Sequence, residues 1–277
     1  MKPIQRPSPL TIGLLATLLL AGLVQDTSLR QALAQSAPND AALAAERAPT
    51  VIELFTSQGC HSCPPADELL AALGERSDIV ALSFHVTYWD RLGWKDPYGS
   101  EWGTNRQRSY AGRLGLSYVY TPQMVIDGHI DAVGSRLSDV DRALQRSQSA
   151  AANRLRISVE EDEAAKSLVV SIPGLVSAPP PGTRLLLLSL DKSRKNAVPR
   201  GENAGKNLHH AHVVRDVTDL GAWDGAAKAF SVPVPLPIPT NADDRSVERL
   251  FAVLAQPIAS NGIPGPILGA GLTKPNS

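Results

Sequence analysis

The chain of 277 residues has only two cysteines, Cys60 and Cys63. Because a structural zinc site usually needs four Cys or His ligands, this scarcity argues against a zinc site built from cysteine pairs. The formal charge is zero, with 27 basic and 27 acidic residues, and no basic block occurs that could neutralise a phosphate backbone. The sequence also lacks an internal repeat and any nucleotide or flavin signature. We therefore expect neither a nucleic-acid partner nor a cofactor.

Long apolar runs are lacking near the N-terminus too. The stretch from Leu10 to Val24 covers 15 residues, whereas a membrane-spanning helix needs about 20. Two basic residues precede it, and Ala32-Leu33-Ala34 forms a small-x-small cleavage site before Gln35. This pattern predicts a signal peptide over residues 1–34, with an uncleaved anchor as the alternative. We expect a periplasmic or secreted protein without stable membrane association after cleavage.

The two cysteines stand as C-H-S-C between the apolar run Thr50–Phe55 and a helical pattern. The free N–H groups and the positive dipole end of a helix start stabilise a thiolate, which is the species that attacks a disulfide. This order predicts a thiol-disulfide exchange site. Cys60 would be the nucleophile, and Cys63, one helical turn later, would resolve the mixed disulfide. Its partners would be protein or small-molecule thiols and disulfides.

Other uses of the cysteine pair stay open. A bridge between Cys60 and Cys63 closes a very short loop, so as a structural staple it would contribute little stability. Two thiolates and an imidazole, from His61 or a distant histidine, suit copper, which makes a copper carrier an alternative. A partner-binding module with a vestigial redox site is another. A protonated His61 would favour the Cys60 thiolate, whereas a solvent-facing one would have little effect.

Strand and helix patterns alternate in the first half. The second predicted strand is Ile79–Val86, and the helix after it ends at Gly115, a typical helix stop. Asp127-Gly128 between two apolar runs predicts a hairpin. A last helix beginning near Ser138 would turn Val140, Ala143 and Leu144 inward.

This order of strand, C-x-x-C, helix, strand, helix and a Thr121-Pro122 hairpin start resembles the thioredoxin fold. The resemblance implies a thioredoxin-like α/β domain over residues 48–152. It also implies a cis Pro122 against the disulfide, with Thr121 and Pro122 binding an extended substrate. An ordinary trans proline at a strand start is the alternative.

A closer resemblance is to the secreted bacterial proteins of domain-of-unknown-function family 1223 (DUF1223). It begins with the run E-L-F-T-S-Q-G-C-H-S-C-P-P-A-D, from Glu53 to Asp67. Further similar segments are Ser83–Val86, Tyr88–Asp90, Gly93–Pro97, Tyr120–Met124 and Arg200–Gly205. The family name carries no established reaction, so this resemblance bears on the fold more than on the function.

An aromatic insertion follows the second predicted strand and contains three of the four tryptophans. Exposed Trp and Tyr rings offer a large contact area at low entropy cost. We therefore expect Trp89 and Trp94, together with His61, to contribute to substrate binding. The alternative is that these rings pin the insertion onto the domain.

The second half offers six short β-like runs separated by Pro, Gly and Asp clusters, which predicts a smaller, mostly antiparallel, sandwich-like β module over residues 153–272. Its glycine-rich segment Arg200–Asn207 would form a turn or a lid over the cysteines. His209, His210 and His212 suggest a metal site, but without further ligands nearby we expect polar strand residues and no metal. The sequence thus predicts an α/β protein that acts as an exported thiol-disulfide oxidoreductase.

Overall fold

The computed structural model describes residues 48–149, 154–237 and 247–273, so the predicted signal peptide lies outside the described residues. Arg47–Ser277 form one compact unit. Within the described ranges, no helix has the length and apolar character needed to cross a membrane.

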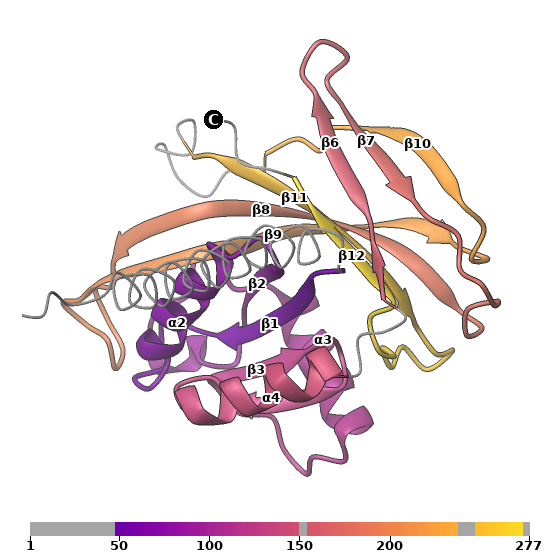
Figure 1. Ribbon diagram of the computed structural model, residues 1–277. Helices are drawn as coiled ribbons and strands as arrows, with labels where there is room; N and C mark the ends of the chain where they lie inside the picture. Colours follow the sequence, from indigo (N-terminus) through magenta and orange to yellow (C-terminus); the bar gives the residue numbers. More distant parts are fainter. Residues whose placement is uncertain (1–47, 150–153, 238–246, 274–277) are drawn as a thin grey trace, which may run out of the picture. The chain divides into compact units, whose positions relative to one another are not determined.

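Twelve strands and three α-helices make up the described part of the chain (Figure 1). The strands are β1 (Thr50–Thr56), β2 (Ile79–His85), β3 (Gln123–Ile126), β4 (Ile130–Val133), β5 (Leu155–Arg156), β6 (Ser158–Asp162), β7 (Ser167–Ile172), β8 (Thr183–Ala197), β9 (Asn207–Ala222), β10 (Lys228–Pro233), β11 (Arg249–Pro257) and β12 (Gly269–Leu272). The helices are α2 (Pro64–Gly74), α3 (Glu101–Leu114) and α4 (Leu137–Ser149), with a 3-10 turn at Asp90–Leu92.

Nine strands form one sheet in the order β4-β3-β1-β2-β9-β8-β11-β12-β5. The predicted α/β, thioredoxin-like class is therefore wrong, because the protein is mostly β and strands from both halves share this sheet. The reason is the pairing of β2. This strand is not the edge of the sheet, because it pairs with β9 through Ser83 and Val213. Strands expected in a separate module extend the first sheet instead. The domain bounds 48–152 and 153–272 stay a prediction.

A second sheet has three antiparallel strands in the order β10-β7-β6. In β7, Leu168, Val170 and Ile172 are buried and alternate with more exposed positions, as in a strand with one covered face. These three side chains pack with Leu187 of β8 and Phe251 of β11 in one hydrophobic cluster. The two sheets thus share a core.

Strand β1 lies inside the large sheet and is buried along its whole length. Its side chains alternate between two cores: Val51 and Phe55 pack on one side, Ile52 and Leu54 on the other. This burial fixes β1, and the cysteine turn follows directly at its C-terminal end.

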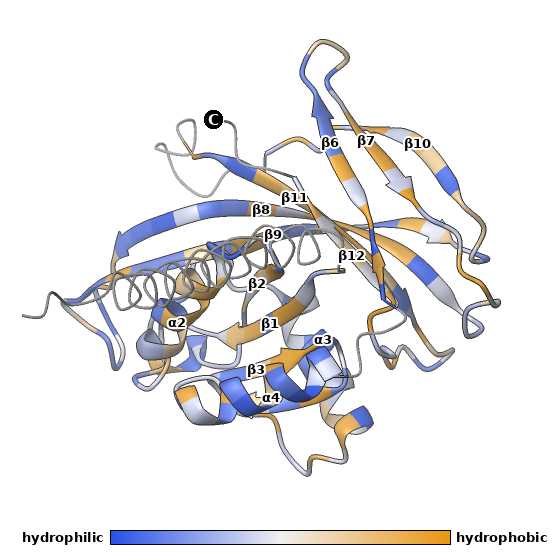
Figure 2. Ribbon diagram, in the orientation of Figure 1, coloured by the Kyte–Doolittle hydropathy of each residue, from blue (hydrophilic) through white to orange (hydrophobic). Residues whose placement is uncertain are grey.

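Strands β8 and β9 form a long antiparallel hairpin that pairs from Arg184–Ala222 to Ala197–Asn207. Figure 2 shows that the ends of both strands nearest their connecting turn are hydrophilic, whereas β8 becomes hydrophobic further along. Strand β9 also packs against α2, the helix that follows the cysteines. The hairpin therefore reaches the cysteine region from a distant part of the sequence.

Several local predictions of the first half are confirmed. Helix α3 begins after Ser100, whose side chain accepts a hydrogen bond from the Gly103 amide, and it ends at Gly115 with φ 68°. Asp127 and Gly128 both have positive φ in the turn between β3 and β4. Helix α4 turns Val140, Ala143 and Leu144 inward, as its periodicity predicts, but begins one residue before Ser138.

Candidate redox site

Cys60 and Cys63 form a disulfide in the turn between β1 and α2. The Cys60 amide donates to the Ser57 carbonyl at 3.1 Å, and the Cys63 amide donates to the Cys60 carbonyl at 3.2 Å. Cys63 stands at the N-cap position of α2 without a side-chain capping bond, and the first two helical positions are Pro64 and Pro65. A proline there removes no helical hydrogen bond, because N–H groups of the first turn lack helical acceptors. The sequence C-H-S-C-P-P therefore delivers the disulfide to the start of a helix, as predicted.

Of the predicted residues, Thr121 contacts Cys60, and Trp89 contacts Thr121. The Thr121–Pro122 peptide bond is cis, as the sequence resemblance implied. The Thr121 hydroxyl donates to Cys60 Sγ at 3.3 Å, and Trp89 Nε1 donates to the Thr121 oxygen at 2.8 Å. Because the Trp89 N–H occupies one lone pair of that oxygen, the hydroxyl proton is directed at the sulfur.

Trp94 contacts the cysteine turn through Gln58 rather than through a sulfur. Its Nε1 donates to Gln58 Oε1 at 3.0 Å. The side-chain Nε2 of Gln58 in turn donates to Asn196 Oδ1 of β8 at 2.7 Å. Both Trp89 and Trp94 are half-buried, so each ring is anchored by its N–H and still has an exposed part. Their role in substrate binding stays a prediction.

His61 and Ser62 are the exposed residues of the C-H-S-C turn, whereas both cysteines have an exposed fraction of 0%. The Ser62 hydroxyl lies 3.5 Å from Cys60 Sγ. His61 reaches the β8–β9 hairpin through its backbone, since its amide donates to Glu202 Oε2 at 3.0 Å.

Sequence reasoning missed the residues of the hairpin turn. Asn203 has an exposed fraction of 0%, and its side-chain amide donates to the carbonyls of Gln58 at 3.0 Å and of Cys60 at 2.9 Å. Glu202 and Asn203 belong to the glycine-rich segment Arg200–Asn207, whose composition predicts a turn or a lid over the cysteines. That signal located the segment without assigning these two side chains.

Sequence reasoning also missed a cluster of four buried titratable side chains next to the turn. His210 Nδ1 of β9 lies 3.6 Å from Asp67 Oδ1 in the first turn of α2. His85 of β2 stacks edge-on against His210, with ring centroids 4.6 Å apart, and its Nδ1 lies 2.7 Å from Asp96 Oδ2. Asp96 Oδ2 also accepts a hydrogen bond from the Gln58 amide at 2.8 Å, which connects the cluster to the cysteine turn.

The charges of this cluster are set by burial and by the pairing. Burial lowers the pKa of His210, but the Asp67 carboxylate and then Asp96 outweigh this effect, and the net pKa is raised above its ordinary value of 6.5. Burial raises the pKa of Asp96, yet His85 and the amides of Gln58 and Tyr98 lower it to about 2. Asp96 is therefore ionised at neutral pH.

Some buried atoms of the cluster have no hydrogen-bond partner among the described residues. They are both carboxylate oxygens of Asp67, Nε2 of His85 and Nδ1 of His210. Such atoms in a native protein call for a functional or solvent-based explanation. Asp67, which links the cluster to α2, lies one helical turn away from Cys63, whose carbonyl accepts its backbone amide proton.

The three histidines considered for metal binding, His209, His210 and His212, each have different neighbours. His209 is exposed and 2.9 Å from the Ser193 hydroxyl, His210 faces Asp67, and the His212 ring lies against Gly74 at the other end of α2. Across residues 48–149, 154–237 and 247–273, no group of three His, Cys, Asp or Glu side chains could hold a metal ion.

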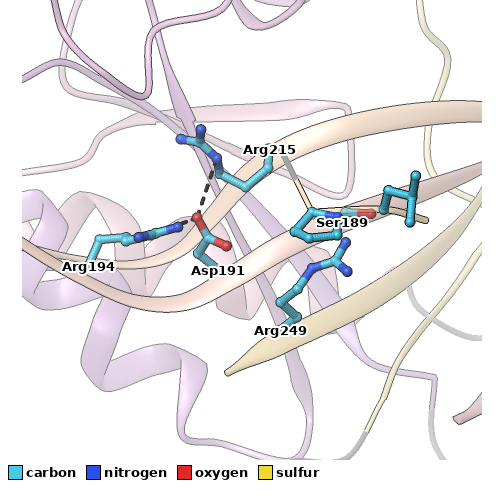
Figure 3. Close-up of a pocket in the computed structure, with 7 residues that line it drawn as sticks. Ser189, Asp191, Arg194, Arg215 and Arg249 are labelled. Carbon is cyan, nitrogen blue, oxygen red and sulfur yellow. Dashed lines mark hydrogen bonds and ion pairs between the residues drawn. The ribbon is translucent and has the colours of Figure 1, made fainter. Parts of the chain in front are cut away.

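A small pocket opens on β8, β9 and β11, and none of the predicted site residues lines it. Figure 3 shows Arg194 and Arg215 pointing at Asp191, with Arg249 beside them. The Asp191 carboxylate accepts a hydrogen bond from Arg194 Nε at 2.8 Å and pairs with Arg215 Nε at 3.3 Å. The aspartate thus engages both guanidinium groups in an ion-pair network.

The sequence model of the family described as "Protein of unknown function (DUF1223)" matches residues 51–254. The chain belongs to the DUF1223 family. This match covers the cysteine turn, Thr121, and the hairpin turn with Glu202 and Asn203, so the DUF1223 region includes every part of the site described above.

The DUF1223 protein is similar to a crystal structure of protein AGR_C_4864 from Agrobacterium tumefaciens, with 30% sequence identity and a TM-score of 0.68, over 84% of this chain and 96% of that one. A second solved structure, HBP35 of Porphyromonas gingivalis, has 14% identity and a TM-score of 0.49, over 83% of this chain and 78% of that one. No curated protein matches the DUF1223 chain.

Proposed function

We propose that this DUF1223 protein is a thiol-disulfide oxidoreductase. The observation that carries the proposal is the Cys60–Cys63 disulfide whose Cys60 sulfur accepts a hydrogen bond from the Thr121 hydroxyl at 3.3 Å. A donor aimed at a sulfur stabilises its thiolate, which is the attacking and the leaving species in disulfide exchange. The N-terminus of α2, where Cys63 stands at the N-cap position, adds the favourable end of the helix dipole.

In the reducing direction, the Cys60 thiolate attacks a substrate disulfide and forms a mixed disulfide, and one substrate thiolate leaves. Cys63, as a thiolate, then attacks Cys60 Sγ, which restores the Cys60–Cys63 bond and releases the second substrate thiolate. Two electrons pass from the cysteine pair to the substrate. The same steps in reverse oxidise a dithiol substrate.

In this proposal, the buried pair of Asp67 and His210 accepts the proton that Cys63 loses. Cys63 is fully buried, and burial without a partner disfavours a thiolate, so reduced Cys63 has to carry a proton that it loses before attack. The Asp67 amide donates to the Cys63 carbonyl, which places the two side chains one helical turn apart on the same face of α2. The Asp67 carboxylate, paired with His210, is therefore our candidate to accept this proton.

We propose that the substrates are protein or small-molecule thiols and disulfides, and that Thr121, Pro122, His61, Trp89 and Trp94 face them. The exposed His61 and the half-buried tryptophans support this assignment. We also propose export to the periplasm or beyond, with cleavage before Gln35. Recovery of the protein in the periplasmic fraction tests the export, and N-terminal sequencing of that protein tests the cleavage, which an intact Met1 would contradict.

A trapping experiment with the two single cysteine variants tests the oxidoreductase proposal. Cys63→Ser leaves Cys60 without its resolving partner, so we expect the Cys60 thiolate to attack a disulfide of oxidised insulin and to stay bound to it as a stable mixed disulfide, with one insulin thiolate released. Cys60→Ser should trap far less. Absence of a mixed disulfide on Cys60 in the Cys63→Ser variant, with the fold intact by circular dichroism, would contradict the proposal.

A further inference from the structure

The disulfide is closed off from solvent. Cys60 and Cys63 each have an exposed fraction of 0%. Thiol-disulfide exchange requires that a second sulfur reach the disulfide bond. A segment over the disulfide must therefore move before any substrate reacts.

The turn of the β8–β9 hairpin, residues 198–206, hydrogen-bonds to the backbone of the cysteine turn through Glu202 and Asn203. Its central contact is made by Asn203, whose Oδ1 accepts a hydrogen bond from Lys206 Nζ at 2.9 Å. That contact orients the amide group so that its nitrogen donates to the carbonyls of Gln58 and Cys60. One side chain thereby fixes the backbone two residues before and directly at the nucleophilic cysteine.

Glu202 makes a second attachment on the other side of Cys60. Its carboxylate accepts the amide proton of His61 at 3.0 Å, and this contact is exposed to solvent. Together, Glu202 and Asn203 bond to the backbone at Gln58, Cys60 and His61. A hydrogen bond of this kind has a modest net strength in water, so the attachment can open reversibly.

The hairpin turn also closes on itself. The Val198 amide donates to the Lys206 carbonyl at 2.9 Å, and the Gly205 amide donates to the Val198 carbonyl at 2.8 Å. Gly201 and Gly205 have φ of 83° and 80°, a conformation that suits glycine. Because these internal bonds do not involve the cysteine turn, the segment can leave it without losing its own structure.

We propose that residues 198–206 form a lid that closes over the Cys60–Cys63 disulfide and opens to admit the substrate, an inference that rests on the proposed exchange reaction. Asn203 and Glu202 hold the lid shut. In the closed state the disulfide is protected from small thiols that are not substrates, and opening exposes Cys60 for attack.

The rate at which dithiothreitol reduces the disulfide in the full chain tests the lid. Asn203→Ala removes both amide hydrogen bonds, and we expect reduction about tenfold faster than in the unmodified protein. Glu202→Gln weakens the bond to the His61 amide, and we expect a severalfold increase. Glu248→Gln is the matched control, because Glu248 pairs with Lys192 away from the turn and its loss should leave the rate unchanged.

Hydrogen exchange of residues 57–63, measured by mass spectrometry on the oxidised chain, gives a second readout. The lid predicts faster exchange there in Glu202→Gln, even where Asn203→Ala fails to fold. Unchanged reduction and exchange rates in Glu202→Gln would overturn the lid and leave the proposed reaction standing. Faster reduction together with an absence of mixed-disulfide trapping would instead overturn the reaction and keep the lid.

Discussion

The side-chain amide of Asn203 donates to the backbone carbonyl of Cys60 at 2.9 Å, although the two residues are 143 positions apart in the sequence. The contact joins the hairpin of the second half to the disulfide of the first. Residues of the second half of the chain therefore belong to the site. A fragment ending near residue 152 would lack both Asn203 and Glu202.

Thr121 should control the acidity of Cys60. In the reduced protein, its hydroxyl is positioned to donate to the Cys60 thiolate and to lower the pKa of the thiol. Thr121→Val removes this donor, and we expect the pKa of Cys60 to rise by about one unit. Thr121→Ser keeps the hydroxyl and is the control. Absorbance of the thiolate near 240 nm across a pH titration measures the change, and equal pKa values in both variants would refute the role.

The Asp67–His210 pair predicts a pH dependence of stability. The pKa of His210 is raised above 6.5 in the folded protein, so the folded state binds its proton more tightly than the unfolded state does. The stabilising contribution is therefore complete below pH 6.5 and is lost as the pH rises through the raised pKa. His85, Asp96 and Tyr98 also face this histidine.

Urea unfolding of the oxidised protein between pH 6 and pH 9 measures this dependence. Asp67→Asn should flatten the decline above pH 6.5, because it removes the carboxylate that raises the pKa of His210. His209→Gln serves as the control, since His209 is exposed and contacts the Ser193 hydroxyl, and Asp67 is only a minor influence on its pKa. The same slope in the Asp67→Asn variant and the unmodified protein would contradict the pairing.

Gly74 should resist replacement by alanine although it lies in a helix. A Cβ at this position would come 2.2 Å from His212 Nε2, so His212 would have to move. We expect Gly74→Ala to destabilise the protein by about 1–3 kcal/mol. Gly112→Ala is the control in α3, where a Cβ would meet nothing closer than Ile263 at 3.8 Å and should stabilise by up to about 1 kcal/mol. Thermal unfolding compares the two, and two stabilising substitutions would show that His212 moves freely.

Glu53 and Arg106 form a buried ion pair that joins β1 to α3. Arg106 Nε donates to Glu53 Oε1 at 2.5 Å, and Arg106 also donates to Gln256 of β11 at 2.8 Å. Glu53→Gln leaves the guanidinium charge buried without its counter-charge, and we expect a loss of about 3 kcal/mol. Glu160→Gln, on the exposed face of β6, should change the free energy of unfolding by less than about 0.5 kcal/mol. Equal effects of the two substitutions would contradict a buried ion pair.

Local sequence signals predicted much of the site. The C-H-S-C turn ahead of a helix, the Thr121-Pro122 step, and the Ser100 and Gly115 ends of α3 all depend on residues close in sequence. Their chemistry is local, because capping, proline geometry and turn formation act over a few residues.

The sheet order and half of the site could not be predicted in this way. Periodicity identifies a strand but not its partner, and β2 joins β9 through one parallel residue pair, Ser83 with Val213. The composition of Arg200–Asn207 predicts a turn or a lid over the cysteines, but no residue near the cysteines indicates the contacts of the individual side chains, Asn203 in that turn and His210 on β9. The error in fold class and the missed site residues have this one cause.

The reduction potential of the Cys60–Cys63 pair, measured in glutathione buffers on the full chain, tests the central claim most directly. The account predicts a reversible couple between about −120 and −270 mV, the range of known redox-active pairs, with the value shifted in Thr121→Val and not in Thr121→Ser. A potential below about −300 mV, unaffected by Thr121, would mark a structural bridge and contradict the account.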